Sequence, residues 1–204
     1  MKKIMIRSVI VIAFAMLFSC TNEKITLESL LQEMTDREAL THFPSPAYTI
    51  KQFSSYDQKS TGPDKEGWFA NNDYTHFIRE ETNNERREFV LFDSNGPGAV
   101  VRYWMTFAGA GASEGTLRIY IDNESQPVIE DSVLKVLSGG LLAEEPLSTS
   151  VSPKTDYQRR GHNLYLPLPY AKHCKITYEC DSIIIENNHR KPSVYYNLKS
   201  AKSY

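Results

Sequence analysis

The chain has 204 residues, of which 41% are hydrophobic, 24% charged and 11% aromatic. This composition is sufficient for one core of ordinary size, and it argues against a disordered chain, which lacks the side chains that offset ordering entropy. The formal net charge of −2 excludes a strongly basic nucleic-acid-binding protein, because neutralising phosphates requires clustered Lys and Arg. We therefore expect a globular protein with no nucleic-acid partner.

Residues 1–19 have the pattern of a lipoprotein signal peptide. Three basic residues precede an apolar run at 9–18, which is too short for a permanent membrane-spanning helix. The run ends at Leu17-Phe18-Ser19-Cys20, which resembles a bacterial lipobox and predicts a lipid anchor at Cys20. Because Thr21 rather than Asp follows, we expect a lipoprotein of the cell envelope, in the outer membrane of a Gram-negative bacterium. The alternative is ordinary secretory cleavage near an incidental cysteine.

Cys174 and Cys180 are expected to be free structural thiols. On one extended strand their Cα atoms would be separated by roughly 20 Å, whereas a disulfide needs Cα atoms within about 7 Å, and no turn residue lies between them. The histidines are scattered, and His173 and Cys174, as neighbours on a strand, point to opposite faces. We therefore expect no metal site and no cofactor.

One segment, residues 25–40, carries a clear helical pattern. Its apolar side chains recur at i, i+3, i+4 and i+7, at positions Leu27, Leu30, Leu31 and Met34. Thr26 suits the N-cap, and two prolines close the segment by position 46. Residues 20–46 are thus predicted to be a tether and an N-terminal helix that precede the main domain, residues 47–204.

After position 46 the apolar pattern changes to a period of two, which is typical of β-strands. Residues 117–121 and 175–179 alternate as half-buried strands do, and residues 100–107 are apolar on both faces, which indicates a central strand. Further elements are expected as strands at 89–92, 163–168 and 182–185 and a short helix at 132–137. Short strands separated by turn signals predict a mainly β protein, a jelly-roll β-sandwich in one domain.

Three loop segments carry side chains suited to binding. Residues 54–57, Ser-Ser-Tyr-Asp, follow a strand candidate, and residues 67–73 place aromatic residues beside three short polar ones. Sugar recognition needs that combination, because an aromatic face packs on ring C–H groups while amides and carboxylates bond hydroxyls. A plain turn would use the same residues. Residues 159–163, Arg-Arg-Gly-His-Asn, could bind an anion, fix a loop or form a solvated turn.

Arg102 differs from these loop residues because it lies inside an apolar strand pattern. A charge in such a position must be paired. The sequence leaves two roles open, a structural ion pair and a guanidinium that faces a substrate.

Several segments, in this order along the chain, resemble one protein family. They are residues 30–37, 52–57, 68–73 (WFANND), 96–104 (GPGAVVRYW), 117–122, 127–130, 160–167 (RGHNLYLP) and 174–179. These segments resemble glycoside hydrolase family 172, of the α-D-fructofuranosidase and D-arabinofuranosidase type, and the resemblance extends over residues 25–197. It implies a jelly-roll fold, hydrolysis of furanosides with retention, and homo-oligomers built on trimers.

The resemblance also implies that half of a family member is absent here. Family members carry two jelly rolls with the catalytic glutamate pair in the second, and this chain stops where the first ends. We therefore expect a lipid-anchored N-terminal part of a furanosidase-like protein, inactive alone, because retaining hydrolysis needs two carboxyl groups about 5–5.5 Å apart. No catalytic residue can be named. The alternatives are a non-catalytic cell-surface module for carbohydrate binding or assembly, and an enzyme gene cut short.

Five side chains are expected to line a furanose pocket, namely Asp57, Trp68, Asn72, Asp73 and Arg102. Trp68 would pack on the sugar ring, and Asn72 and Asp73 would hydrogen-bond its hydroxyls. Arg102 would pair with a carboxylate or meet the sugar directly.

Overall fold

The computed structural model describes residues 25–45, 47–186 and 189–203 of the chain. The predicted signal peptide and Cys20 lie outside these residues, so both the signal peptide and the lipid anchor stay predictions. Within the described ranges, no helix is both long enough and apolar enough to cross a membrane.

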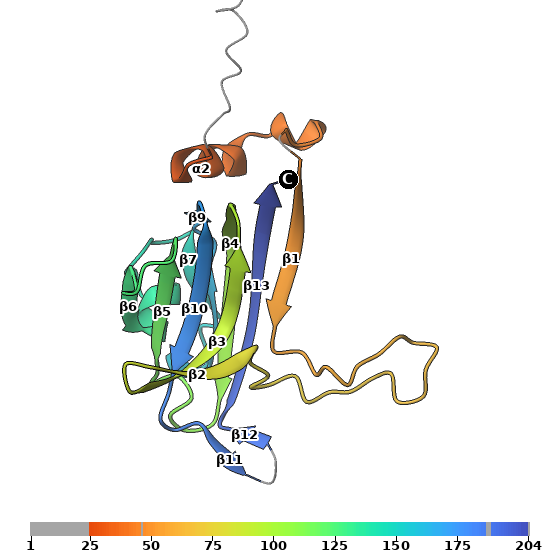
Figure 1. Ribbon diagram of the computed structural model, residues 1–204, viewed down its shortest axis with the longest axis vertical. Helices are drawn as coiled ribbons and strands as arrows, with labels where there is room; N and C mark the ends of the chain where they lie inside the picture. Colours follow the sequence, from red (N-terminus) through yellow and green to blue (C-terminus); the bar gives the residue numbers. More distant parts are fainter. Residues whose placement is uncertain (1–24, 46, 187–188, 204) are drawn as a thin grey trace, which may run out of the picture.

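Two antiparallel sheets pack face to face (Figure 1). Sheet A has the order β1 (Tyr48–Ser54), β13 (Ser193–Ser203), β4 (Gly98–Ala108), β8 (Gly161–Leu164) and β7 (Ser148–Val151), with β9 (Leu168–Tyr170) also paired to β4. Sheet B has the order β2 (Arg79–Asn83), β3 (Arg86–Asn95), β10 (His173–Glu179), β5 (Thr116–Ile121) and β6 (Ile129–Ser132). A separate pair consists of β11 (Ile184–Glu186) and β12 (His189–Lys191).

The strand order is that of a jelly roll. The four strands β1-β13-β4-β8 of sheet A lie opposite β3-β10-β5-β6 of sheet B, so the chain crosses repeatedly between the sheets and its first and last strands pair as neighbours. This arrangement encloses a core while leaving few strand edges. The predictions of a mainly β protein and a jelly-roll β-sandwich are confirmed.

The central strand of sheet A shows how the sequence places one face inside and one outside. In β4, Tyr103, Met105 and Phe107 are buried, whereas the alternate residues Arg102 and Trp104 are partly exposed. Residues 89–92 of β3 are fully buried and supply the facing layer. A short helix, α3 (Val133–Ser138), closes one side of the core with three buried side chains, Val133, Val136 and Leu137.

The predicted N-terminal helix is present but shorter than its apolar pattern. Helix α2 runs over Leu27–Thr35, and Thr26 and Ser29 form a reciprocal capping box. The helix ends because the Asp36 carboxylate accepts hydrogen bonds from the backbone N–H groups of Glu38 and Ala39, which turns the chain into a short 3₁₀ helix, η1 (Ala39–Thr41). None of the residues of α2 is buried.

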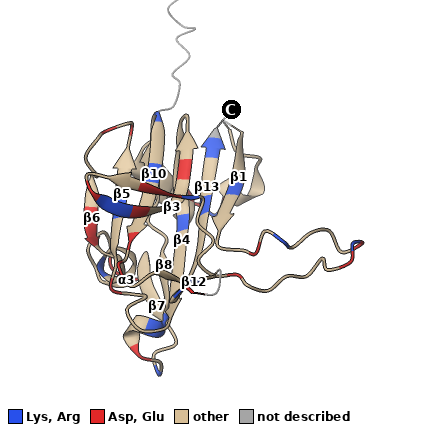
Figure 2. Cartoon of the chain, turned by 60° about the horizontal axis from the view of Figure 1, so that its bottom comes forward, with Lys and Arg blue, Asp and Glu red and all other residues tan. Residues whose placement is uncertain are grey.

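Some strand predictions were wrong in detail. Residues 117–121 and 175–179 are not half-buried, because Arg118, Tyr120 and Thr177 on the outer face are also buried. Arg118 forms ion pairs at 2.8 Å with Glu130 and 2.6 Å with Glu179, and the Tyr120 hydroxyl donates to Glu88, so the outer face of sheet B is a paired polar layer. Figure 2 shows acidic and basic residues close together on this sheet.

The single strand expected at 163–168 is two strands. β8 ends at Leu164 and β9 starts at Leu168, with Pro167 between them, and proline has no N–H to donate to a ladder. Cys174 and Cys180 are free and buried, as expected. Burial raises the pKa of the Cys174 thiol to about 12, so that thiol is unreactive near neutral pH.

Candidate functional site

Asp57 and Asp73 hold together two parts of the segment that joins β1 to β2. The Asp73 carboxylate accepts a hydrogen bond of 2.7 Å from the backbone N–H of Asp57, and the Ser55 hydroxyl donates to the Asp73 carbonyl at 2.9 Å. In return, the Asp57 carboxylate accepts from the backbone N–H groups of Lys59 and Asn72. These bonds, the one from Lys59 above all, hold the pKa of Asp57 below its usual value.

The backbone of the second loop is held in an unusual conformation next to this pair. Thr75 has a φ of +52°, in the left-handed region that a β-branched residue rarely adopts. Its N–H donates to the Val194 carbonyl and its hydroxyl donates to the Arg190 carbonyl, each at 2.8 Å. Tertiary hydrogen bonds thus fix a strained residue, which is a common feature of functional loops.

The fixed loop and the β11–β12 hairpin enclose a cavity of about 260 Å³, lined by Asn72, Tyr74, Thr75, His76, Ile185, His189 and Arg190. We call it the loop pocket. His76 Nε2 lies 2.8 Å from the Asn72 carbonyl. Because a carbonyl can only accept, Nε2 carries the proton in this bond, and Nδ1 of the neutral ring remains an acceptor.

The remaining polar groups of the loop pocket come from the hairpin and from Tyr74. The Tyr74 ring lies 6.4 Å from the His189 ring and 6.1 Å from the Tyr195 ring. The Arg190 guanidinium forms an ion pair with Glu80 at 3.6 Å, which neutralises its charge. The pocket therefore offers hydrogen-bonding groups beside aromatic surface, with little net charge.

Of the five predicted site residues, the structure brings three together. Asp57, Asn72 and Asp73 are joined by the bonds above, and Asn72 lines the loop pocket. Asp57 is only 2% exposed, and the carboxylates of both aspartates accept hydrogen bonds from backbone N–H groups, as in the turn that the sequence left open as an alternative.

Trp68 lies on a long arm between β1 and β2, which stands away from the sandwich in Figure 1. The arm is held by its own bonds, among them Thr61 N–H to the Trp68 carbonyl at 2.9 Å. The indole is 45% exposed and packs edge-on against Phe69 at 5.5 Å between ring centroids. Trp68 does not line the loop pocket.

Arg102 lies on the outer face of sheet A and also stands outside the loop pocket. Its guanidinium lies 5.9 Å from the centroid of the Tyr165 ring. Its Nε atom is buried without a hydrogen-bond partner among the described residues. The structural ion pair that the sequence left open for Arg102 is not found in the described part of the chain.

The third predicted segment, residues 159–163, fixes a loop. The Arg160 guanidinium donates to the backbone carbonyls of Thr155 at 2.9 Å and Pro153 at 2.8 Å. His162 is fully buried, and its Nδ1 lies 2.6 Å from the Ser138 hydroxyl. Of the three roles left open by the sequence, loop fixing is the one that these bonds support.

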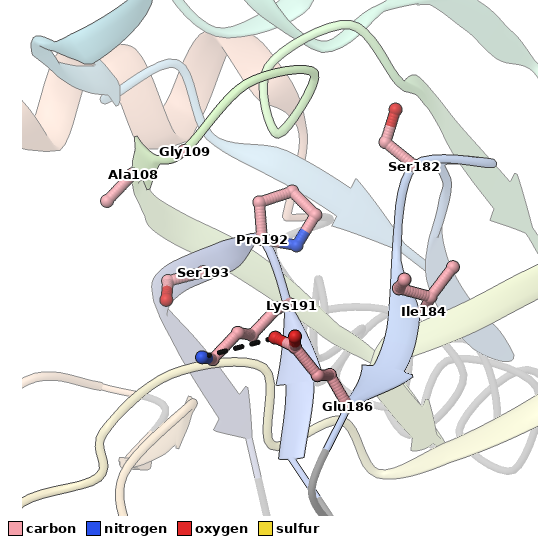
Figure 3. Close-up of a pocket in the computed structure, with 8 residues that line it drawn as sticks. All are labelled: Ala108, Gly109, Ser182, Ile184, Glu186, Lys191, Pro192 and Ser193. Atoms are coloured by element: carbon pink, nitrogen blue, oxygen red, sulfur yellow. Dashed lines mark ion pairs between the residues drawn. The ribbon is translucent and has the colours of Figure 1, made fainter.

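A second cavity, of about 370 Å³, lies on the other side of the hairpin (Figure 3). Its charged groups, Glu186 and Lys191, pair with each other at 3.4 Å, and the other lining residues are small or apolar. This cavity lacks the convergent unpaired polar groups of a ligand site. Within the described residues no cluster of three or more His, Cys, Asp or Glu suits a metal ion.

Sequence reasoning missed most of the loop pocket. His76 follows the predicted cluster by three residues and could have been included with it. His189 and Arg190 could not, because more than a hundred residues separate them from Asn72 in the sequence and only the fold brings the β12 hairpin to that loop.

Fold and site together define a jelly-roll β-sandwich domain with a polar pocket where its loops meet. The family model described as GH172 first beta-sandwich domain matches residues 46–202, which is most of the chain. The chain therefore belongs to glycoside hydrolase family 172, as its motifs indicated. A search of curated proteins found no match.

Proposed function

We propose that this domain is the sugar-binding, N-terminal part of a family 172 protein, that its loop pocket takes a furanose ring, and that it is inactive alone. The observation that carries the proposal is a pocket lined by Asn72, two imidazoles and a phenol, whose wall is held in place by the backbone hydrogen bonds of Asn72. Amides, neutral imidazoles and phenols donate and accept hydrogen bonds, as the hydroxyls of a sugar require.

The size and charge of the loop pocket favour one neutral sugar ring. Its volume of about 260 Å³ lies just below the usual range of about 300–1,000 Å³ for ligand sites, and its one charged side chain, Arg190, is paired with Glu80. These features support a D-fructofuranoside or D-arabinofuranoside, the substrates that the family resemblance implies.

Binding without cleavage follows from the carboxylates. Retaining hydrolysis requires two carboxyl groups about 5–5.5 Å apart, and no Asp or Glu lines the loop pocket. Asp57 and Asp73 adjoin it, but they are engaged with backbone N–H groups. In this proposal they position Asn72, and the catalytic pair belongs to another part of the enzyme.

Calorimetric titration with methyl D-arabinofuranosides and methyl D-fructofuranosides tests the proposal. Asn72→Ala should weaken binding at least tenfold, because it removes the amide from the pocket. Asn71→Ala is the matched control, since this exposed neighbour does not line the pocket, and it should bind as the parent does. Equal binding by both variants would contradict the site, and hydrolysis by this chain, followed by chromatography, would contradict the claim that it is inactive alone.

Lipid anchoring at Cys20 is a separate part of the proposal, supported by the lipobox-like sequence. Cys20→Ala should release the protein from the outer membrane and abolish incorporation of labelled fatty acid. Continued labelling of that variant would rule out Cys20 as the anchor.

We also propose that the domain works in a homo-oligomer, built on trimers where the second half of the protein is present. The support is apolar surface near the N-terminus, where Leu40 is 85% and Phe43 99% exposed, since exposed apolar patches drive association. The same surface favours the alternative of a non-catalytic assembly module. Sedimentation of the parent and of Phe43→Ser tests whether this surface forms the oligomer interface. If it does, the variant should dissociate and sediment as a smaller species than the parent.

A further inference from the structure

The outer face of sheet A carries one row of side chains across five strands. Trp104 on β4 is paired in register with Asn163 on β8 and with Asn197 on β13. The row continues to Thr149 on β7 and Ser54 on β1. One indole thus lies between two carboxamides, an arrangement that we call the indole row.

The indole of Trp104 lies against the sheet. A Cβ atom at Gly161 would stand only 3.0 Å from Trp104 Nε1, so the ring crosses β8 at a position without a side chain. Trp104 is nevertheless partly exposed, which leaves ring surface open to solvent. The exposed part of an aromatic ring in this position can pack on the C–H groups of a sugar ring.

The carboxamides beside the indole differ in how well they are satisfied. Asn163 Oδ1 accepts a hydrogen bond from the Tyr165 hydroxyl at 3.3 Å. Asn197 Oδ1 is buried and has no hydrogen-bond partner among the described residues. A buried acceptor without a donor is unfavourable, and rotation of the Asn197 amide toward the row would let a ligand hydroxyl satisfy it.

A pair of like charges lies next to the indole row. Arg102 and Lys199 are directly opposite each other on β4 and β13, an arrangement that destabilises a sheet unless the charges are neutralised. Figure 2 shows basic residues in blue on both strands. Neither residue forms an ion pair within the described part of the chain. Arg102 Nε is in addition buried without a hydrogen-bond partner among the described residues. A bound anion would neutralise the two cations and accept hydrogen bonds from Arg102.

The indole row and the charged pair lie close enough together along β4 to form one site. Arg102 and Trp104 are two residues apart on β4, which is about 6.6 Å in a strand. A carboxylate attached to a sugar ring can therefore reach the charged pair while its ring covers the indole. The loop pocket lacks this feature, because its one charged side chain, Arg190, is neutralised by Glu80.

We propose that the outer face of sheet A binds an acidic saccharide. The ring packs on Trp104, a ring hydroxyl donates to Asn197 Oδ1, and the carboxylate lies between Arg102 and Lys199. This site is separate from the furanose-binding loop pocket and uses none of its residues.

Calorimetric titration with three probes tests the ligand chemistry. D-Galacturonate carries both the ring and the carboxylate, D-galactose has the corresponding ring without the acid, and acetate has the acid without the ring. We expect D-galacturonate to bind at least tenfold more tightly than either of the others, and its affinity to fall as salt is added. If acetate bound as tightly as D-galacturonate, the site would be a simple anion site. If D-galactose bound as tightly as D-galacturonate, the charged pair would have no role in binding.

Variants test the location. Lys199→Gln should abolish the preference for D-galacturonate over D-galactose, Lys199→Arg should retain it, and Asn197→Ala should weaken binding of both sugars. Lys51→Gln is the matched control, because Lys51 lies next to β13 with its side chain on the opposite face of the same sheet, over Phe53, and it should bind as the parent does. Circular dichroism and thermal unfolding show whether each variant is folded.

Two further outcomes would overturn the proposal. Loss of D-galacturonate binding in Asn72→Ala would place the ligand in the loop pocket. Self-association that Lys199→Gln abolishes would show that an acidic residue of a second copy occupies the charged pair. Binding of the neutral furanosides is measured separately, so failure of either sugar site leaves the other site's test intact.

Discussion

His162 should make the stability of this protein depend on pH between 7 and 5. The imidazole is fully buried against the sandwich interior, with the Tyr157 ring edge-on at 5.1 Å between centroids and the Phe107 ring at 6.1 Å. Its Nδ1 is bonded to Ser138, but its Nε2 is buried without a partner among the described residues. Protonation would therefore create a desolvated cation in the interior of the sandwich.

The magnitude follows from the pKa. Desolvation lowers the pKa of His162 from 6.5 to about 4, with a partial offset from a hydrogen bond to the backbone carbonyl of Tyr157 and a smaller further lowering by the charge of Arg160. Between these values the unfolded chain binds a proton that the folded protein does not, so the free energy of unfolding falls as pH falls through this window. For these two pKa values the loss between pH 7 and pH 5 is about 2 kcal/mol.

Urea unfolding at pH 7 and pH 5, followed by tryptophan fluorescence, measures this loss. The parent protein should lose about 2 kcal/mol, whereas His162→Gln, although less stable at pH 7, should lose much less. His42→Gln is the matched control because His42 is exposed, and it should behave as the parent does. The comparison stops at pH 5 because the pKa values of Asp57, Glu80 and Asp93 are lowered in the folded protein. Protonation of these three carboxylates would add its own loss of stability at lower pH.

The reasoning would be refuted if His162→Gln and the parent lost the same free energy between the two pH values. NMR titration offers an independent check on the same group. An imidazole signal of His162 that moves with a midpoint near 6.5 would show that the ring is hydrated and accepts a proton in the folded state.

Three other substitutions test the packing. Gly115→Ala should lower the free energy of unfolding by on the order of 3 kcal/mol, because a Cβ there would overlap the Glu179 carbonyl oxygen and the Tyr178 ring. An unchanged urea midpoint would contradict this overlap. Arg118→Met should cost about 3–5 kcal/mol, since it leaves the buried carboxylate of Glu88 and its neighbours Glu130 and Glu179 without this cation, and calorimetry of the variant measures the loss. Gly161→Ala should shift the fluorescence of Trp104 by pushing the indole off β8, and an unchanged spectrum in a Trp68→Phe background would show that the ring does not lie there.

Local patterns were sufficient to predict the fold class. The apolar run of β4, the alternation at β10 and the capping signal at Thr26 depend on neighbours in the chain, so the sequence predicts strands and the N-terminal helix directly. The exceptions have causes that the periodic pattern of apolar residues cannot show. Pro167 interrupts a ladder, and the buried Arg118 is accepted because three carboxylates from other strands surround it.

The candidate site divides in the same way. Asp57, Asn72 and Asp73 were identifiable as polar loop residues, and their mutual hydrogen bonds join segments only about fifteen residues apart. Whether such residues bind a ligand or hold a turn depends on what lies opposite them, and here that is a hairpin from the other end of the domain.

The sequence by itself determined the apolar and polar alternation of the strands, the helix with its cap and the family motifs, because each is a property of neighbouring residues. Only the tertiary structure decided which polar residues share a surface. It separates Trp68 on its arm from Asn72 in the loop pocket, and it sets Arg102 against Lys199 although 97 positions separate them along the chain. The physical reason is that strand pairing in a jelly roll joins distant segments, and no local period records which strands become neighbours.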